Sequence, residues 1–253
     1  MSDKEIAAIR KFVAGGGKII ADFSPGMFDE LGMKREQAPL PETILTGKIF
    51  AENSDGDRKE LQQLLLQTSS QPVLQCEGIA DTPGREAMHF TSSTNSVYTV
   101  IRNFTLSNDN REQTFVFPRK GHVYDLRSQK YLGETDRVSC RVPNADAAVF
   151  GLLPYRIDAL QIKTPSSVIA GTNLQAAIAV EVSDGKPGKH IFHVELENPA
   201  GENPVSLQRN LVAPQGQSDF VFRMAANDPK GIWILRVNDV LSGLTSEKKF
   251  SLQ

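Results

Sequence analysis

Short runs of alternating apolar and polar residues, separated by turn residues, fill the chain from about residue 72 to its end. Side chains of a β-strand alternate between the two faces of a sheet, so a period of two predicts half-buried strands in antiparallel sheets. The separating residues are those that commonly end strands, such as Pro, Gly, Asn and Asp. We therefore predict a mainly β fold. The predicted strands are 73–77, 86–91, 97–104, 114–117, 122–126, 137–142 and 147–153, and then 159–163, 174–182, 190–197, 205–212, 220–224, 232–237 and 247–252.

The two series of strands predict two β domains. The second series places about seven short strands in about 95 residues, which is typical of an immunoglobulin-like or fibronectin-like β-sandwich. A turn-rich stretch over 154–158 separates it from the first series. We therefore expect a β-rich middle domain over 56–155 and a C-terminal sandwich over 156–253.

The N-terminal segment has a different pattern. Ser2 and Glu5 form a capping box just before an apolar stripe at helical spacing, and a run of glycines over 15–17 ends the predicted helix. The apolar run 18–23 then suits a buried strand. A buried parallel strand needs neighbouring strands. Residues 1–55 are therefore interpreted as the remnant of an α/β, flavodoxin-like or amidotransferase-like domain followed by a linker. A short helix is predicted over 58–67.

Charge and hydropathy exclude several partners. The formal net charge is −2, which argues against nucleic-acid binding through bulk positive charge. No apolar run approaches the roughly 18 residues of a membrane span. The charged, amphipathic residues 1–13 do not form a signal peptide. We predict no nucleic-acid partner and no membrane partner.

Motifs that would indicate catalysis or metal binding are weak. Gly15–Lys18 has the order helix, glycines, strand, whereas a phosphate-binding loop follows a strand and precedes a helix. No G-x-S-x-G nucleophile elbow occurs. His190 and His193 lie on a predicted strand, so their side chains should point to opposite faces. We predict no catalytic residue, no cofactor and no metal site, and therefore no enzyme activity in this chain.

The two cysteines, Cys76 and Cys140, leave alternatives open. They are far apart in sequence and have no metal-binding spacing. Two buried free thiols are the simpler interpretation, and one disulfide is the other. A cysteine hydrolase using either thiol is the least favoured function. In the polar hairpin over 121–136, Asp125 and Arg127 are predicted to form a structural ion pair, with a ligand contact as the other interpretation.

Aromatic residues are the candidates for sugar binding, because sugars stack on exposed aromatic rings. Trp233, Tyr98, Tyr124 and Tyr131 are the candidate carbohydrate-binding residues. Trp233 alternates with isoleucines in a predicted strand, so core packing is its favoured role. A stand-alone carbohydrate-binding module is the alternative function on this basis.

Several strings resemble one family. They are SDKEIAAIRKFVAGGGKIIADFSPGMFDELG near the start, GHVYDLRSQKYLGETD and AAVFGLLPY in the middle, and ENPAGENP and NDPKGIWILRVNDVLSG near the end. In this order they resemble the C-terminal, non-catalytic region of large bacterial β-galactosidase-like glycoside hydrolases. In that family the end of an amidotransferase-like trimerisation domain is followed by β-sandwich modules.

The resemblance implies an accessory and assembly role. The family's catalytic glutamates lie on a barrel upstream of this region, so none is carried onto a residue of this chain. The implied partners are the rest of a larger glycoside-hydrolase-like chain or further copies of the chain, with polysaccharide as a candidate ligand. A periplasmic or secreted location as part of a larger protein is the corresponding expectation.

Overall fold

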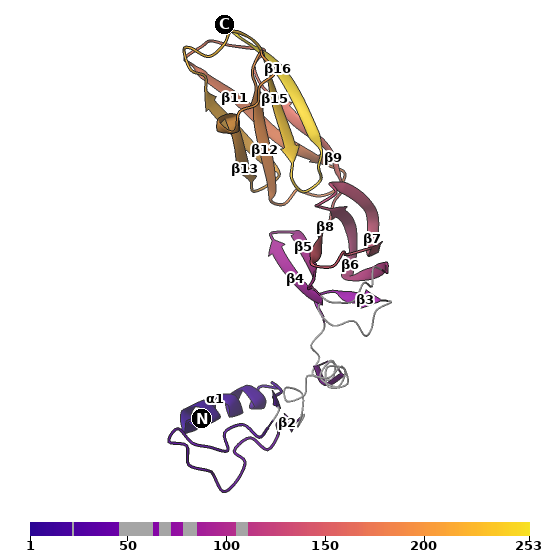
Figure 1. Ribbon diagram of the computed structural model, residues 1–253, viewed down its shortest axis with the longest axis vertical. Helices are drawn as coiled ribbons and strands as arrows, with labels where there is room; N and C mark the ends of the chain where they lie inside the picture. Colours follow the sequence, from indigo (N-terminus) through magenta and orange to yellow (C-terminus); the bar gives the residue numbers. More distant parts are fainter. Residues whose placement is uncertain (22, 46–62, 66–71, 78–84, 105–110) are drawn as a thin grey trace. The chain divides into compact units, whose positions relative to one another are not determined.

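The computed structural model confirms a mainly β fold (Figure 1). Two compact units are distinguished, Met1–Pro72 and Val73–Gln253, and each is described by itself. The predicted helix over 58–67 lies outside the described residues except for 63–65, which are helical. The structure describes residues 1–21, 23–45, 63–65, 72–77, 85–104 and 111–253.

The first unit begins with the predicted helix, α1 (Asp3–Ala14). The Ser2 hydroxyl accepts a hydrogen bond from the Glu5 amide at 3.3 Å, and the Glu5 carboxylate accepts one from the Ser2 amide at 2.7 Å. These two bonds complete the capping box that the sequence predicts. The Ser2 amide and the Ser2 hydroxyl, which donates at 3.0 Å, both bond to the Glu5 carboxylate and hold its pKa below its ordinary value. The helix ends at Gly15, whose amide donates to the Lys11 carbonyl at 3.1 Å.

Two very short strands follow the helix. β1 (Ile20–Ala21) pairs in parallel with β2 (Ile44–Leu45), two residues on each side. The sequence predicts a strand over 18–23, but only two of its residues pair, and residue 22 lies outside the described residues. Parallel pairing agrees with the α/β interpretation of this segment.

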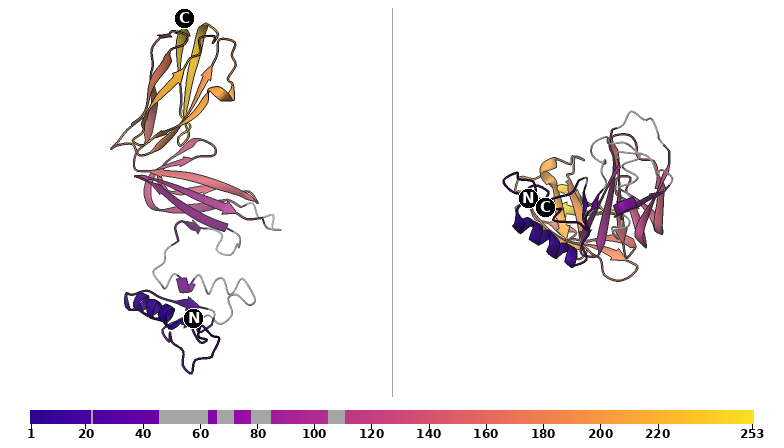
Figure 2. Two further views of the ribbon diagram at one scale, coloured as in Figure 1. Left: turned by 90° about the vertical axis from the view of Figure 1, so that its left-hand side faces the viewer. Right: turned by 90° about the horizontal axis from the view of Figure 1, so that it is seen from below.

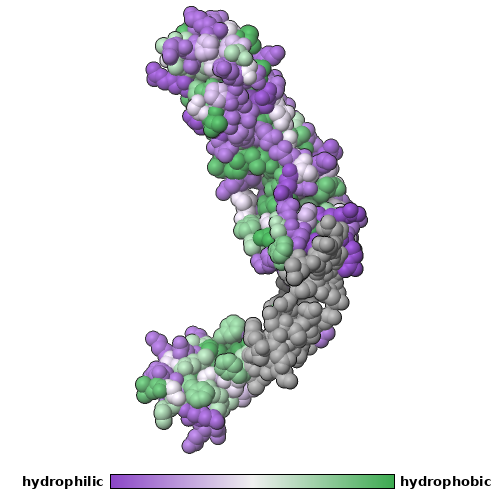
Figure 3. Space-filling model, in the orientation of Figure 1, coloured by the Kyte–Doolittle hydropathy of each residue, from purple (hydrophilic) through white to green (hydrophobic). Residues whose placement is uncertain are grey.

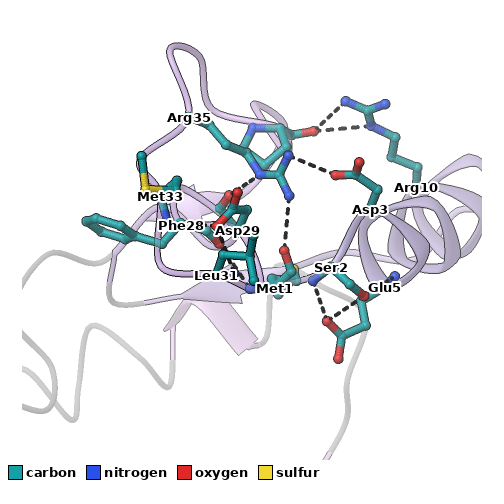
Figure 4. Close-up of polar contacts among 12 residues, drawn as sticks. Met1, Ser2, Asp3, Glu5, Arg10, Phe28, Asp29, Leu31, Met33 and Arg35 are labelled. Atoms are coloured by element: carbon teal, nitrogen blue, oxygen red, sulfur yellow. Dashed lines mark hydrogen bonds and ion pairs between the residues drawn. The ribbon is translucent and has the colours of Figure 1, made fainter.

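Polar contacts fasten the long connection between these strands to α1 (Figure 4). The guanidinium of Arg35 pairs with the Asp3 carboxylate at 2.8 Å, and it donates to the carbonyls of Gly26 at 3.0 Å and Met1 at 3.1 Å. The Arg10 guanidinium donates a hydrogen bond to the Pro39 carbonyl at 2.9 Å. In this segment, hydrogen bonds to backbone carbonyls therefore provide much of the stabilisation that buried apolar side chains provide in a larger domain.

The second unit contains a six-stranded middle sheet of order β3-β6-β8-β5-β4, with β7 paired to β6. The long β6 pairs with β3 near its start and with β8 near its end, and its pairing with β7 shifts register between Val116 and Gly121. A Cβ at Gly121 would lie 2.8 Å from Leu152 and from the Leu153 carbonyl, so only glycine fits at this crossing. The strands are β3 (Gln75–Glu77), β4 (Arg85–Ser92), β5 (Asn95–Arg102), β6 (Gln113–Asp125), β7 (Lys130–Cys140) and β8 (Asp146–Leu153).

The rest of the second unit is a β-sandwich (Figures 1 and 2). A three-stranded sheet of order β14-β11-β9 faces a five-stranded sheet of order β10-β16-β15-β12-β13, in which β10 and β16 pair in parallel. The predicted strand 205–212 begins as a 3-10 turn, Val205–Leu207, and becomes a strand only at Gln208. The strands are β9 (Ile157–Lys163), β10 (Ser167–Val168), β11 (Asn173–Val182), β12 (His190–Glu197), β13 (Gln208–Ala213), β14 (Gln217–Arg223), β15 (Gly231–Asp239) and β16 (Thr245–Leu252).

Only residues 154–156 connect β8 to β9, and the two parts share packing there. The Tyr124 hydroxyl of β6 accepts a hydrogen bond from the Ile157 amide of β9 at 2.8 Å. Tyr124, Leu153 and Tyr155 belong to the same buried cluster as the core of the sandwich. The predicted domain boundary between residues 155 and 156 falls at this join.

Candidate functional site

Three of the four aromatic residues predicted to bind sugar are buried. Trp233 is 2% exposed, and its indole N–H donates to the Pro229 carbonyl at 2.9 Å. Tyr98 and Tyr124 are also buried, while the ring of Tyr131 is 40% exposed. A ring that stacks on sugar needs an open face, which Trp233, Tyr98 and Tyr124 do not have in this structure. Sugar binding by these four residues stays a prediction, with Tyr131 as its best-placed member.

The structure brings two of these four residues together. The rings of Tyr124 and Tyr131 lie 5.1 Å apart between centroids, on the hairpin of β6 and β7. The Tyr131 hydroxyl lies 2.8 Å from His122 Nδ1, and the Arg156 guanidinium lies 5.3 Å from the Tyr131 ring. Arg156 therefore already occupies one face of the exposed ring. Trp233 and Tyr98 lie in two separate hydrophobic cores.

The predicted ion pair of the hairpin has a different acidic partner. Asp125 does not pair with the Arg127 side chain, because its carboxylate accepts the amides of Arg127 at 2.9 Å and Ser128 at 3.1 Å and so shapes the turn. The Arg127 guanidinium instead pairs with Asp146 on β8. This hydrogen bond, together with one from a backbone amide, holds the pKa of Asp146 below its ordinary value.

His190 and His193 point to opposite faces of β12, as the sequence predicts. His193 contacts Asn210 at 2.8 Å on the half-exposed face. His190 is fully buried, and its Nδ1 lies 2.9 Å from the Asp239 carboxylate. Its Nε2 lies 3.0 Å from the Tyr155 hydroxyl.

A buried polar network extends from His190 across the join between the sandwich and the middle sheet. The Tyr155 hydroxyl donates to Asn95 Oδ1 at 2.8 Å and accepts from the Gly188 amide at 2.8 Å. The Asn95 amide donates to the Lys189 carbonyl at 3.0 Å. The bonds of Asn95 join the middle sheet to Tyr155 on the connection and to Lys189 just before β12, so this network fixes the two β regions to each other.

The polar groups of this network are hydrogen-bonded to one another. Burial raises the pKa of the Tyr155 hydroxyl, which weakens it as a nucleophile. The Ser242 hydroxyl donates to the Asp239 carboxylate at 2.6 Å. An apolar groove of about 230 Å³ lies beside the network, with Phe90 and Leu241 in its wall, but the His190 side chain is 0% exposed.

Sequence reasoning did not connect the members of this network. Asn95, Tyr155 and Asp239 carry no local motif, and each sits on a different strand or connection. The one available signal is the phase of β12, which places His190 on the same buried face as Phe192. A buried imidazole needs hydrogen-bond partners, so this phase predicts partners without naming them.

Both cysteines are free thiols. Cys76 pairs with Phe115 and Cys140 pairs with Gln113, so the two cysteines lie on opposite sides of β6. Two strand spacings amount to about 10 Å, beyond the reach of a disulfide. The alternative of a disulfide is therefore not formed here. The expectation of two buried thiols is wrong: Cys76 lies exposed on the edge strand β3, and Cys140 is only partly buried.

We predict slow alkylation of both thiols by iodoacetamide at pH 7. Desolvation raises the pKa of the partly buried Cys140 thiol to about 11. The sulfur of Cys76 is also partly desolvated where it faces Gln113, although the residue as a whole is exposed, and this raises its pKa too. Because the thiolate is the reactive form, Cys140 should react about two orders of magnitude more slowly than glutathione, and its rate should rise with pH. Mass spectrometry of the labelled peptides measures both rates. Rapid labelling of either residue would revive the cysteine hydrolase hypothesis.

The first unit exposes an unusual amount of apolar surface. Within its described residues, the buried apolar side chains are those of Ile6, Pro39 and Leu40. Leu31 is 83% exposed and Phe23 is 77% exposed. Figure 3 shows hydrophobic residues (green) mixed with hydrophilic ones (purple) on the visible surface of this unit. The other strongly exposed apolar side chains are Phe12, Phe28 and Met33.

None of the helices among the described residues has the length and apolar character required to cross a bilayer. Among the same residues, no group of three or more His, Cys, Asp or Glu side chains is placed to hold a metal ion.

Comparisons with known proteins give only weak likenesses. No family model matches the sequence, and no curated protein matches it. A superoxide reductase (neelaredoxin) from Ignicoccus hospitalis has 14% identity and a TM-score of 0.29, over 38% of this chain and 82% of its own. A β-glucosidase from Listeria innocua has 15% identity and a TM-score of 0.29, over 40% of this chain and 17% of its own. A glycosyl hydrolase family 2 member from Bacteroides cellulosilyticus has 11% identity and a TM-score of 0.27, over 63% of this chain and 24% of its own. The weak structural neighbours thus include glycoside hydrolases, but likeness at this level assigns neither a family nor a function.

Proposed function

We propose that this chain is a non-catalytic accessory and assembly region of a larger carbohydrate-active protein, joined to it through residues 1–45. The observation that carries the proposal is the missing core of this segment. It has one helix and a parallel pair of two-residue strands, yet Ile6, Pro39 and Leu40 are its buried apolar side chains among the described residues. A segment of roughly 45 residues rarely folds on so little burial without a partner.

The partner's chemistry follows from the parallel pair. Parallel sheets are normally covered on both faces, so β1 and β2 call for further parallel strands and for apolar helix faces. Phe23 and Leu31 lie on the connection between β1 and β2 and supply apolar surface for such a layer. The partner is therefore an α/β layer, supplied by another polypeptide segment or another chain. The resemblance of residues 2–32 to the end of an amidotransferase-like domain supports a glycoside-hydrolase-like protein as its source.

Hydrogen exchange of the intact chain tests this proposal. We expect the amides of α1 to exchange nearly as fast as those of an unfolded chain, because a segment without a core opens readily. The amides of β11, β12 and β15 should stay protected for far longer. Mass spectrometry of peptic fragments reports both regions in one experiment.

Light scattering at the same protein concentrations separates the outcomes. Protection of α1 that appears only together with oligomers would identify further copies of the chain as the partner. Strong protection in a monomer would overturn the proposal, since residues 1–45 would then be self-sufficient.

Binding of the dye ANS to two variants tests the exposed apolar surface of the first unit. Leu31→Ser should lower ANS binding, and its matched control Val205→Ser, at an 80% exposed position of the sandwich, should lower it much less.

A further inference from the structure

We infer that the outer face of the three-stranded sheet is a binding trough for a neutral saccharide chain. The trough lies entirely in the sandwich, on β9, β11 and β14, and none of the residues predicted from the sequence to bind sugar contributes to it. Its biological setting rests on the proposed function. Its geometry and its test are independent of residues 1–45.

Strand register builds the trough. Ala177 of β11 stands between Lys163 of β9 and Asp219 of β14. One step along the sheet, Ala179 stands between Gln161 and Gln217. Since neighbouring strands are about 4.8 Å apart, the long polar side chains form two walls about 10 Å apart above a floor of methyl groups.

The hollow is large enough for sugar residues. Its volume is about 470 Å³ between these two rows. A second hollow of about 370 Å³ continues along the sheet past Gln175 and Val221, which stand opposite each other. The two hollows share Ala177 and Asp219, so they form one extended path that suits a chain-like ligand.

The polar groups of the walls are available to a ligand. No hydrogen bond or ion pair is found for the side chains of Gln161, Lys163, Gln175, Gln217 or Asp219 within the described residues. Each glutamine amide offers both a donor and an acceptor, which matches the paired hydroxyl groups of a sugar ring. The methyl floor can receive the apolar face of the ring.

Charge and backbone pairing favour a saccharide over other polymers. The opposite charges of Lys163 and Asp219 cancel, so the trough carries no net charge. Binding of a phosphate chain would need several cationic side chains. The backbone of β11 already pairs with β9 and with β14, so an extended peptide cannot be added at the floor. Recognition must come from side chains alone, as it does for a hydroxyl-rich ligand.

The test measures binding of the intact chain to cellohexaose, xylohexaose and β-1,4-galactohexaose by isothermal titration calorimetry. We expect at least one of these sugars to bind. Ala177→Ile should raise its Kd at least tenfold by filling the floor, and isoleucine suits a strand, so folding should be kept. Gln161→Ala should raise Kd by about three- to tenfold through a lost hydrogen bond. Ser251→Ile is the matched control on the outer face of the other sheet and should leave Kd unchanged.

Each other outcome overturns the inference. No binding of any of the three sugars at 5 mM (a concentration of about that order suffices for millimolar affinity) would remove the trough as a saccharide site. Binding that survives Ala177→Ile but is lost in Tyr131→Ala would place the sugar at the hairpin instead. Because none of these variants touches residues 1–45, hydrogen exchange of α1 reports separately on the proposed function.

Discussion

Replacing His190 with alanine should lower the free energy of unfolding of the second unit by about 3–5 kcal/mol. The imidazole is the partner of the buried Asp239 carboxylate at 2.9 Å, and it also contacts the Tyr155 hydroxyl at 3.0 Å. Alanine leaves the carboxylate with hydrogen bonds from Ser242 only, in a place that water does not reach. An uncompensated buried charge is among the costliest defects that a single substitution produces.

Urea unfolding followed by tryptophan fluorescence measures this loss, because Trp233 is the only tryptophan of the chain and lies in the sandwich core. His193→Ala is the matched control, three residues along the same strand on its half-exposed face. Its cost should stay below about 1 kcal/mol, since its contacts with Asn210 and Glu195 are partly exposed to water. Equal losses in the two variants would show that the buried network does not stabilise the join.

Raising the pH from about 10 to about 12 should remove roughly 2–3 kcal/mol of stability through Tyr124 alone. Burial raises the pKa of this hydroxyl from 10.0 to about 12 in the folded protein. The folded state therefore keeps its proton where the unfolded chain loses it. The stabilisation is complete below pH 10 and is lost as the pH rises through 12. Tyr98, Tyr155 and Cys140 are shifted in the same direction and add to the loss.

Tyr124→Phe separates this contribution from the others. The variant should have a shallower loss of stability between pH 10 and 12, because one of the shifted protons is gone. At pH 7 it should be less stable by about 1–3 kcal/mol, because the Ile157 amide loses its acceptor. Tyr131→Phe, in which Tyr124 is still present, should keep the steep alkaline loss. An unchanged slope in Tyr124→Phe would contradict the assignment.

The parts of the fold that follow local rules are predictable from the sequence. The capping box of Ser2 and Glu5 gives α1, because it acts within one helical turn. The alternation of apolar residues gives most strands of the sandwich, since a half-buried strand imposes a period of two. The opposite orientations of His190 and His193 follow from the same period.

The candidate sites depend on which strands become neighbours, and that information is not local. Trp233 and Tyr98 are suitable in type for a sugar platform or for a core, and only the phase of their strands decides between the two. The trough cannot be predicted from the sequence without the register of β9, β11 and β14, because only strand pairing places Lys163 and Asp219 on either side of Ala177. The predicted acidic partner of Arg127 was wrong for the same reason. The observed partner, Asp146, becomes a neighbour of Arg127 only through the pairing of β8 with β6.

The short join between β8 and β9 has a consequence for how this region is inherited. Tyr155 lies before the sandwich in sequence, but its ring packs with the sandwich core and its hydroxyl bonds with Asn95 of the middle sheet. A recombination breakpoint between codons 155 and 156 would separate that ring from half of its partners and expose the buried ends of both sheets. Genes that exchange modules of this kind should therefore carry residues 73–253 as one piece.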